Sequence, residues 1–374
     1  MDGVDVAVVS INAQDPSAPP QIEAAHTASF SDRLVDGLDQ AKRWVESDHR
    51  GFMQNPLCAE LDELLAHAFA EAAIALVSES GLAMSAITAI GSHGQTLCHR
   101  PHNDPPISLQ LANPQSIADL TLCPTIGRFR QADLDAGGQG APLAPLLHRH
   151  LFAHQQETRA VLNLGGIGNL TLLMPDKPTI GFDTGPANAL LDYWYQQHHD
   201  TDPSSRFDAG GHWASQGTSH HDLVSKLLDD PFFKTPPPKS TSIEYFGEQW
   251  LSNHLSGFAC LAPEDVQASL TQLTVEGVVR ALQQTCPTDK PLDRLIVCGG
   301  GAHNQTVMAK LQQALPKTQV SASDDLNVSG DHLEALLFAW LAHQRWHDRP
   351  QDTTHITGAR CAVLLGEIHH PSMA

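Results

Sequence analysis

The chain has 374 residues, 41% of them hydrophobic, and a formal net charge of −20. At about 100–200 residues per domain, this length favours two domains with sizeable cores. The acidic balance disfavours binding to nucleic-acid phosphates or anionic membranes. The sequence contains no run of about 18 apolar residues, so we do not expect a membrane-spanning helix. Residues 1–5 lack the basic start of a secretory signal. We therefore expect a cytoplasmic protein.

The cysteines and histidines do not predict a metal site. The 7 cysteines are an odd number without C-x-x-C spacing, which is typical of reduced thiols rather than of disulfides or zinc ligands. The 22 histidines include pairs such as His198-His199 in polar surroundings. Because no carboxylate cluster accompanies them, we interpret them as solvated and assign no direct metal ligand.

The spacing of apolar residues predicts alternating strands and helices. In the first part of the chain we expect a strand at 4–11, helices at 29–45 and 57–79, a strand at 86–90, a helix at 113–120, a strand at 125–126 and a helix at 143–152. The second part is expected to contain strands at 160–164 and 170–174, a polar loop at 200–217, a helix at 221–228, irregular chain at the proline-rich residues 231–239, a helix at 264–284, a strand at 295–297, and helices at 305–315 and 331–346. This alternation predicts α/β layers.

Residues 181–188 contain a candidate catalytic carboxylate. Asp183 stands between an apolar residue and a Thr-Gly-Pro turn, and a helical pattern begins at Ala189. Gly and Pro this close together end a strand, so we expect Asp183 at a strand end, facing a cleft. A carboxylate there can take a proton from a hydroxyl group or a water molecule. The alternative is that Asp183 only caps the following helix.

Three glycine-containing segments together suggest a bound nucleotide. The first is the turn at 165–169, which contains Gly165, Gly166 and Asn169 and joins two predicted strands into a hairpin. Glycine there lets backbone N–H groups approach a phosphate closely. The alternative is an ordinary tight hairpin turn.

The second segment follows the strand at 295–297. It contains Gly299, Gly300 and Gly301 and leads through Asn304 into a helix. Backbone without side chains at a helix N-terminus can pack against a purine and its sugar, or hold a phosphate. It matches neither the dinucleotide-binding pattern nor a P-loop, and the alternative is a close strand-to-helix crossing that needs glycine.

The third segment is Asp2 and Gly3, which run directly into the strand at 4–11. They look like the second half of another glycine-tipped hairpin. Two such hairpins, one per domain, facing a cleft with an aspartate between them, are the arrangement of actin and the sugar kinases. In that arrangement, phosphoryl transfer depends on positioning and on charge stabilisation by backbone N–H groups and Mg²⁺.

Taken in order, the motifs resemble those of the anhydro-N-acetylmuramic acid kinases, members of the actin-like sugar-kinase superfamily. The resemblance runs nearly end to end. It rests on Ser-His-Gly-Gln-Thr at 92–96, Gly-Gly-Gln-Gly-Ala-Pro-Leu at 137–143, Leu-Asn-Leu-Gly-Gly-Ile-Gly-Asn-Leu-Thr at 162–171, Gly-Phe-Asp-Thr-Gly-Pro at 181–186, Pro-Lys-Ser-Thr at 238–241, Cys-Gly-Gly-Gly at 298–301, Gly-Asp-His-Leu-Glu-Ala at 330–335 and Thr-Gly-Ala at 357–359.

The resemblance implies an α/β fold of two actin-like, ribonuclease H-like domains around an ATP cleft. Residues 1–127 and 352–374 would form one domain, and residues 128–351 the other. It implies an ATP- and Mg²⁺-dependent kinase that opens 1,6-anhydro-N-acetylmuramic acid with water and phosphorylates O6. The product, N-acetylmuramic acid 6-phosphate, belongs to peptidoglycan recycling. The resemblance also implies a homodimer.

The resemblance assigns roles to individual residues. Asp183 would be the general base that activates water. Gln95 and Arg130 are candidates for sugar contacts, with Arg130 suited to the lactyl carboxylate through bidentate donors. His93 and Glu334 are further candidates, with a buried histidine satisfied by backbone and a helix-surface charge as the alternatives. The residues expected to contact ATP or its phosphates are Asp2, Gly3, Gly165, Gly166, Asn169, Gly299, Gly300, Gly301 and Asn304.

The chain departs from the family pattern at three places. The family begins with Gly-Thr-Ser-(Met or Leu)-Asp-Gly-Val-Asp, of which this sequence has the part from Met1 onward. We therefore expect the strand at 4–11 to lack the pairing neighbour that the family's first strand would supply, and the kinase to be less stable. We also expect it to be impaired, because losing one preorganised donor costs about 10²–10³ in rate. Arg128 replaces a usual Asp near Arg130. Ala187 replaces a usual Gly, so its φ must stay negative or become strained.

Two other functions stay open at this point. One is a kinase for another amino sugar. The other is a non-catalytic amino-sugar-binding or regulatory protein, which the missing phosphate loop would favour.

Overall fold

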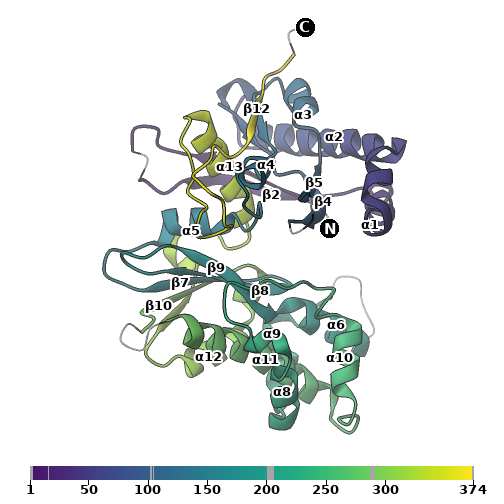
Figure 1. Cartoon of the computed structure of the whole chain (residues 1–374), viewed down its shortest axis with the longest axis vertical. Coiled ribbons are helices and arrows are strands. Elements are labelled where there is room, and N and C mark those ends of the chain that lie inside the picture. The colour runs from purple at the N-terminus through teal and green to yellow at the C-terminus, as the bar shows by residue number, and fades with distance from the viewer. Residues whose placement is uncertain are drawn as a thin grey trace. The chain divides into compact units, whose positions relative to one another are not determined.

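The computed structural model describes residues 3–15, 17–101, 103, 105–199, 206–286 and 291–372, so Asp2 lies outside the described residues. The chain divides into two compact units, shown in Figure 1. Unit 1 comprises Met1–His150 and His332–Ala374, and unit 2 comprises Leu151–Asp331. Each unit combines sheets with helices, which confirms the expected α/β class.

The boundaries between the two units lie after residues 150 and 331. The sequence led us to expect domain boundaries after residues 127 and 351. Hydrogen bonds hold the residues in question within unit 1. Arg130 donates to His93, and Asp133 accepts from Thr353. Such contacts join residues far apart in the sequence, so local patterns could not reveal them.

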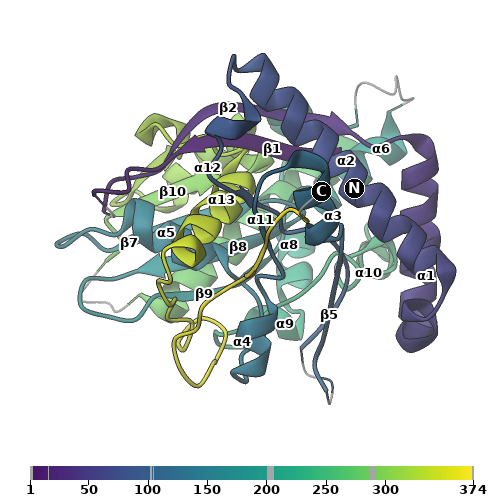
Figure 2. The same ribbon diagram turned by 90° about the horizontal axis from the view of Figure 1, so that it is seen from above.

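The described part of unit 1 contains three sheets. A long antiparallel pair is visible in Figures 1 and 2, a second sheet has the strand order β12-β6-β3, and the third is a hairpin. The strands are β1 (Gly3–Ser10), β2 (Gln21–Ser29), β3 (Ile90–Gly91), β4 (Gln95–Arg100), β5 (Ile107–Leu111), β6 (Thr125–Gly127) and β12 (Glu367–His369).

Helices enclose the core of unit 1. The second helix begins where Asn55 accepts a hydrogen bond from Leu57 N at 2.9 Å and a proline occupies the first turn. Leu38, Phe52 and Leu65 are among the core residues, each at most 1% exposed. The helices are α1 (Asp32–Met53), α2 (Pro56–Glu79), α3 (Pro114–Thr121), α4 (Gln131–Asp135), α5 (Ala144–Phe152) and α13 (Leu333–Trp346).

Unit 2 is built on one five-stranded sheet with the order β11-β10-β7-β8-β9. β11, β10 and β7 run parallel, and β7, β8 and β9 form antiparallel pairs. Leu162, Leu170 and Phe182 face a core shared with two helices, α11 and α12, which lie together on one side of the sheet in Figure 1. The strands are β7 (Arg159–Leu164), β8 (Ile167–Leu173), β9 (Ile180–Pro186), β10 (Arg294–Cys298) and β11 (Gln319–Ala322).

The remaining helices also belong to unit 2. A second core beside the sheet is formed mainly by aromatic and leucine side chains, including Phe233, Phe246 and Leu227. The helices are α6 (Asn188–His198), α7 (His212–Gln216), α8 (His221–Leu228), α9 (Pro231–Lys234), α10 (Glu248–Leu255), α11 (Pro263–Thr285) and α12 (Gln305–Ala314), with a 3₁₀ turn at Gly300–His303.

Several expected elements have different bounds. The hairpin turn expected at 165–169 is shorter, because β7 and β8 stay paired up to Leu164 and Gly168, which leaves Gly165, Gly166 and Ile167 between them. Residues 231–239 are not irregular throughout: Asp230 caps α9 by accepting a hydrogen bond from Phe232 N, and a proline occupies the first turn of this helix. The polar loop at 200–217 contains α7. The strand expected at 86–90 is reduced to β3.

Asp133 ties together distant segments of unit 1. Its side chain is 0% exposed and accepts hydrogen bonds from Thr353 Oγ1 at 2.5 Å, Thr357 Oγ1 at 2.7 Å and Gly140 N at 2.7 Å. Gly140 O in turn accepts a hydrogen bond from Arg130 Nη1 at 3.4 Å. The buried carboxylate is therefore well satisfied, and it fixes the loop that supports Arg130.

Replacing Asp133 with Ala removes the shared acceptor of three donors. Each buried group left unsatisfied costs about 1–3 kcal/mol, so we expect the free energy of unfolding to fall by about 3 kcal/mol or more in urea denaturation. The control is Asp135→Ala, because among the described residues the side chain of that exposed carboxylate bonds to Gln131 alone; it should change stability by less than about 0.5 kcal/mol. Equal losses in the two variants would contradict the assignment.

Candidate active site

Asp183 lies inside β9 rather than at a strand end, because pairing with β8 continues to Pro186. Asn169 lies opposite Asp183, and the next pair is Gly168 with Gly185, so Thr184 is an extra residue in β9. The Thr184 hydroxyl donates to Gly168 O at 3.0 Å. This β-bulge stands directly after Asp183, and bulges bend a strand and redirect the chain that follows.

Three polar side chains form a row across the sheet of unit 2. Asn163 of β7 is opposite Asn169 of β8, and Asn169 is opposite Asp183. Directly opposed residues share a face of the sheet. The neighbouring Leu162 and Phe182 face the core, so the polar row lies on the other face.

Sequence reasoning did not assign Asn163 a role. Its Oδ1 lies so close to Gly299 that a Cβ atom there would stand 2.3 Å away, and Cys298 Sγ lies 4.0 Å from the same oxygen. The signal that could have identified it is an amide in the otherwise apolar strand Ala-Val-Leu-Asn-Leu at 160–164.

The carboxyl group of Asp183 is half-buried and unevenly solvated. Burial raises the pKa of Asp183 to about 6, and a hydrogen bond from Thr241 N to Oδ2 at 2.8 Å opposes this rise. Oδ1 has no hydrogen-bond partner in the part of the chain that the structure describes. A carboxyl group with one oxygen held, the other available and a pKa near neutrality is suited to accept a proton.

The segment that holds Asp183 is itself anchored. Asp183 N donates to Lys239 O at 2.9 Å. The Lys239 ammonium donates to Phe232 O at 3.0 Å and lies 4.4 Å from the centre of the Phe232 ring. Lys239 therefore fastens the segment that carries Thr241 through a hydrogen bond and a cation–π contact.

The hairpin tip is fixed by the start of α6. Gly166 O accepts from Ala187 N at 3.0 Å, and Gly165 O accepts from Asn188 N at 3.0 Å. Ala187 has a φ of −128°, so alanine at this position requires no left-handed backbone conformation.

The packing of the protein does not require glycine at this tip. Neither Gly165 nor Gly166 has a left-handed φ. A Cβ atom would stand 3.7 Å from its nearest neighbour at Gly165 and 3.5 Å at Gly166, which are ordinary contact distances. Tight hairpin turns need glycine where φ is positive, so these observations favour close approach of a ligand to the backbone.

In the second glycine segment, residues 299–301, some glycines are required by packing and one is open to a ligand. Gly299 has a φ of +73° and a Cβ atom at Gly301 would stand 2.4 Å from a leucine of β7, so these two glycines satisfy packing. Gly300 is different, because its nearest neighbour would be Asn188 Nδ2 at 3.6 Å. Gly300 is thus open and lies near the residue that binds the hairpin tip.

Two other candidate contacts have structural roles. Asn304 caps α12, because its Oδ1 accepts a hydrogen bond from Val307 N at 3.0 Å. At Gly3, a Cβ atom would stand 2.3 Å from Ala28 O, so pairing of β1 with β2 requires glycine there. Contacts of either residue with a nucleotide remain predictions.

In unit 1, Arg130 and His93 form a close pair. Arg130 Nε and Nη2 lie 3.0 and 2.9 Å from His93 Nε2. Because a guanidinium only donates, the imidazole must accept at Nε2 and carry its proton on Nδ1. The His93 ring stacks on Phe338 with centroids 4.4 Å apart. His93 is therefore held by side chains as well as by backbone.

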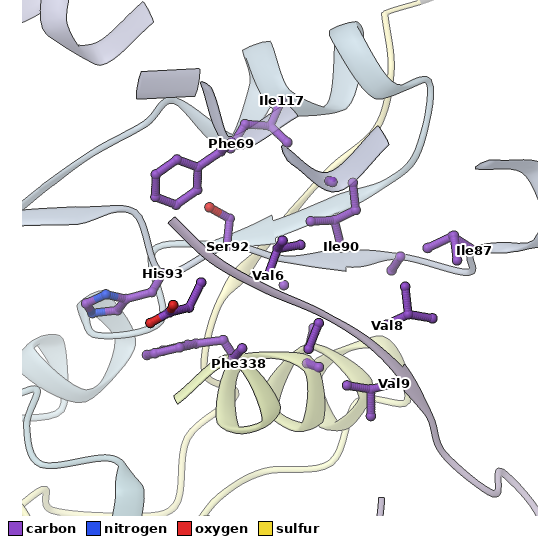
Figure 3. Close-up of a pocket in the computed structure, with 18 of the residues that line it drawn as sticks. Val6, Val8, Val9, Phe69, Ile87, Ile90, Ser92, His93, Ile117 and Phe338 are labelled. Carbon is purple, nitrogen blue, oxygen red and sulfur yellow. The ribbon is translucent and has the colours of Figure 1, made fainter. Parts of the chain in front are cut away.

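Burial and neighbouring charges shift the pKa values of both His93 and Arg130. Burial, followed by the charge of Arg130, lowers the pKa of His93 to about 3. Burial also lowers the pKa of Arg130, and the carboxylate of Glu334 opposes this. Glu334 and Gln95 line the same cavity, which Figure 3 shows beside His93 and Phe338. Glu334 lies in the first turn of α13 and is exposed, although desolvation by the surrounding protein raises the pKa of its carboxyl group. Its alternative role as a helix-surface charge therefore stays open.

Arg128 does not contribute to holding Arg130. It has a φ of +54°, and its Nη1 donates to Glu367 Oε2 at 3.1 Å. The change from the usual aspartate therefore leaves the contact between Arg130 and His93 in place.

Within the described residues, no group of three or more His, Cys, Asp or Glu side chains is placed to hold a metal ion. None of the helices described combines the length and apolarity that a membrane crossing requires.

Comparisons with known proteins show the family of the chain. A family model described as anhydro-N-acetylmuramic acid kinase matches residues 1–371. Proteins of that name from Xylella fastidiosa and Photobacterium profundum are each 44% identical to the chain; the alignments cover 99% and 100% of it and 93% and 96% of those proteins. A solved structure, the activator of the 2-hydroxyisocaproyl-CoA dehydratase from Clostridium difficile with bound ADPNP, aligns with 61% of this chain and 71% of its own at a TM-score of 0.30 and 15% identity, too weak a likeness to carry an argument.

Alanine should have different effects at a glycine that stays open to a ligand and at a glycine that packing requires. Gly165→Ala should leave the thermal midpoint unchanged but reduce turnover with ATP by about 10²–10³, because a methyl group displaces phosphate from backbone donors. Gly185→Ala is the contrast. Gly185 has a φ of +130°, and its Cβ atom would stand 2.7 Å from Phe233.

For Gly185→Ala we expect a loss of about 1–3 kcal/mol in the free energy of unfolding. Thermal melts and ATP titrations of both variants separate the two effects. If Gly165→Ala lowers the thermal midpoint as much as Gly185→Ala does, the tip glycine serves packing and not a ligand.

Proposed function

The chain belongs to the anhydro-N-acetylmuramic acid kinase family, and from this premise we propose how its residues carry out the reaction. The enzyme uses ATP to open 1,6-anhydro-N-acetylmuramic acid and to phosphorylate O6, which yields N-acetylmuramic acid 6-phosphate. The observation that carries the mechanism is the half-buried carboxyl group of Asp183, with a pKa of about 6 and one oxygen available.

In the proposed reaction, a water molecule gives a proton to Asp183, and its oxygen forms a bond to the anomeric carbon. The bond from that carbon to O6 breaks, and its electron pair moves to O6. O6 then forms a bond to the γ-phosphorus of ATP while the bond from this phosphorus to ADP breaks. The proton on Asp183 passes to solvent after each turnover.

The environment of Asp183 supports this role. Water is a poor nucleophile, and a positioned base contributes about 10²–10⁴-fold to such a step. A carboxyl group of ordinary pKa is a weaker base than one raised toward the working pH. The N–H of Thr241 orients the carboxyl group by holding Oδ2, so Oδ1 faces the attacking water.

The glycines form the proposed phosphate site. Gly165, Gly166 and Gly300 are open positions where backbone N–H groups can approach the phosphates of ATP. Mg²⁺ would be held mainly by phosphate oxygens and water, as Mg²⁺ usually keeps several waters and needs few carboxylates. The other proposed contacts with ATP are Asp2, Gly3, Asn169, Gly299, Gly301 and Asn304.

Arg130 is proposed to bind the lactyl carboxylate of the sugar. Its guanidinium has five N–H donors, of which His93 and Gly140 O engage only part. His93 positions the guanidinium, and Gln95 and Glu334 are proposed to contact sugar hydroxyl or amide groups. Glu334 also keeps Arg130 from standing alone as a buried charge.

Two further parts of the proposal come from the family. The protein acts in the cytoplasm, where it recycles peptidoglycan sugar, and it forms a homodimer.

The first test is Asp183→Asn. The variant should lose about 10²–10⁴-fold in kcat while calorimetry still shows binding of both ATP and the anhydro sugar. It should also unfold at a higher temperature at pH 8, because a neutral amide avoids the cost of a desolvated charge. Unchanged turnover would remove Asp183 from the mechanism. Binding of N-acetylglucosamine in preference to the anhydro sugar would favour a different amino-sugar kinase, and sugar binding without ATP binding would favour a regulatory protein.

The pH profile gives an independent readout of the same group. Because the pKa of Asp183 is raised to about 6, the base is ionised above that pH and activity falls as pH drops through it. Thr241→Pro removes the N–H that favours the ionised form, so the acid limb should move to higher pH. Thr241→Ala keeps the N–H and should leave the limb in place.

The second test concerns Arg130. Arg130→Lys loses the planar set of donors, and a charge-assisted hydrogen bond is worth about 1.5–3 kcal/mol. We therefore expect the KM for the anhydro sugar to rise about tenfold to a hundredfold with the KM for ATP unchanged. His93→Leu should act in the same direction, and His93→Gln, whose amide oxygen can accept, should restore part of the loss. Equal effects of both His93 variants would indicate a purely structural role.

A further inference from the structure

One loop of unit 2 holds the carboxyl group of Asp183. This loop, residues 232–245 (the Thr241 loop), begins within α9 and ends before α10. Asp183 N donates to Lys239 O at 2.9 Å, and Thr241 N donates to Asp183 Oδ2 at 2.8 Å. Residues 235–247, all of them described, form no helix or strand. The shape of the loop therefore depends on the side chains that hold its two ends.

The carboxylate of Asp230 joins the two ends of the Thr241 loop. Asp230 stands directly before α9 and is only 8% exposed. Its Oδ1 accepts a hydrogen bond from Phe232 N, at the first end of the loop, at 2.9 Å. The hydroxyl of Tyr245, at the other end, lies 3.0 Å from Oδ1 and 3.2 Å from Oδ2 and donates to this carboxylate. Asp230 thus closes the loop.

Helix capping explains only part of this arrangement. A carboxylate at the N-cap position commonly accepts from the backbone of the first turn, and the bond from Phe232 N to Asp230 is of this kind. Two more donors come from side chains outside α9. Trp250 Nε1 of α10 donates to Oδ2 at 2.9 Å, and the Tyr245 hydroxyl is the other. A buried carboxylate costs free energy unless such donors surround it, so Asp230 does more than cap a short helix.

The path from Asp230 to Asp183 is short in both directions along the loop. From the first end, Phe232 O accepts from Lys239 Nζ at 3.0 Å, and Lys239 O accepts from Asp183 N. From the other end, Tyr245 N donates to Ser242 Oγ at 3.3 Å, and Ser242 directly follows the residue whose N–H holds Oδ2. A change at either end of the loop therefore reaches the carboxyl group of Asp183 through few contacts.

Burial of the ring does not impose the contact between Tyr245 and Asp230. Tyr245 is 49% exposed, and its ring packs edge-on against Phe246 with centroids 4.9 Å apart. A phenylalanine could keep this ring contact. The hydroxyl group is therefore what connects the far end of the Thr241 loop to the buried carboxylate.

We propose that Asp230 is a positioning residue for the reaction: by closing the Thr241 loop through Tyr245, it keeps the N–H of Thr241 directed at Oδ2 of Asp183. Oδ1 is thereby left facing the attacking water. This inference rests on the proposed role of Asp183 as the base, and Asp230 acts through the loop rather than on the substrate. Orientation matters here because misplacing a reacting group by about 1 Å can cost about 10²-fold in rate.

Hydrogen exchange tests the structural part of the inference. Tyr245→Phe keeps the ring and removes the donor, so exchange of the Thr241 amide should become about threefold to tenfold faster. The matched control is Tyr193→Phe, which removes a hydroxyl group bonded to another carboxylate, that of Glu248, outside the Thr241 loop. It should leave exchange at Thr241 unchanged. Unchanged exchange in Tyr245→Phe, or equal acceleration in both variants, would overturn the inference.

A double-mutant cycle tests the catalytic part. Tyr245→Phe should lower kcat by about threefold to tenfold and leave the KM for the anhydro sugar unchanged. In the Asp183→Asn background, the same change should have no further effect on kcat, because both act through one group. A full effect of Tyr245→Phe in that background would assign the loss to something other than the base and would overturn the inference.

Variants of Asp230 itself separate positioning from bulk stability. Asp230→Ala removes all three contacts and should lower kcat at least as much as Tyr245→Phe. Asp230→Asn keeps one oxygen that can accept from Tyr245, so it should restore part of this loss, and equal losses in the two Asp230 variants would count against positioning. If Asp183→Asn leaves turnover unchanged, the proposed function fails, whereas the exchange rate of Thr241 still shows whether Asp230 closes the loop.

Discussion

The pairing of β8 with β9 is the constraint on which the catalytic arrangement depends. Because Asn169 pairs with both Asp183 and Asn163, the three side chains lie on the same face of the sheet, away from the core. The extra residue, Thr184, then shifts the register so that the chain enters α6 where Ala187 and Asn188 can bind the glycine tip. A slip of one residue would move Asp183 to the opposite face. One bulge therefore fixes the positions of both the proposed base and the proposed phosphate-binding loop.

Local sequence patterns predicted the elements that depend on local forces. The amphipathic spacing at 57–79 and the β-branched run at 4–11 correspond closely to α2 and β1. Elements that depend on distant partners were not predicted. β2 exists because it pairs with β1, and α9 begins at a proline that sequence alone marked as a breaker. The boundaries of the two units also differ from the expected domain boundaries, since Asp133 bonds to threonines more than 200 positions away.

The candidate site was predicted through its reactive residues and not through the residues that support them. Asp183 was identified by the turn that follows it, but the backbone N–H of Thr241 that orients it lies in a separate segment. Arg130 was selected for its chemistry, whereas its orientation depends on His93 and on the loop that Asp133 fixes. Asn163 was missed because the residues that lie beside an amide in a strand cannot be inferred until the register of the neighbouring strands is known.

The glycines show most clearly that the role of a residue cannot be assigned from the sequence without its surroundings in the structure. Gly299 and Gly165 each follow a strand and each suggested contact with a nucleotide. At Gly299, a left-handed φ and the nearness of Asn163 already require glycine, so a ligand is not needed to explain it. At Gly165, neither conformation nor packing requires glycine. The proposed approach of a phosphate would account for glycine there. The same residue type thus satisfies packing in one loop and is open to a proposed ligand in the other.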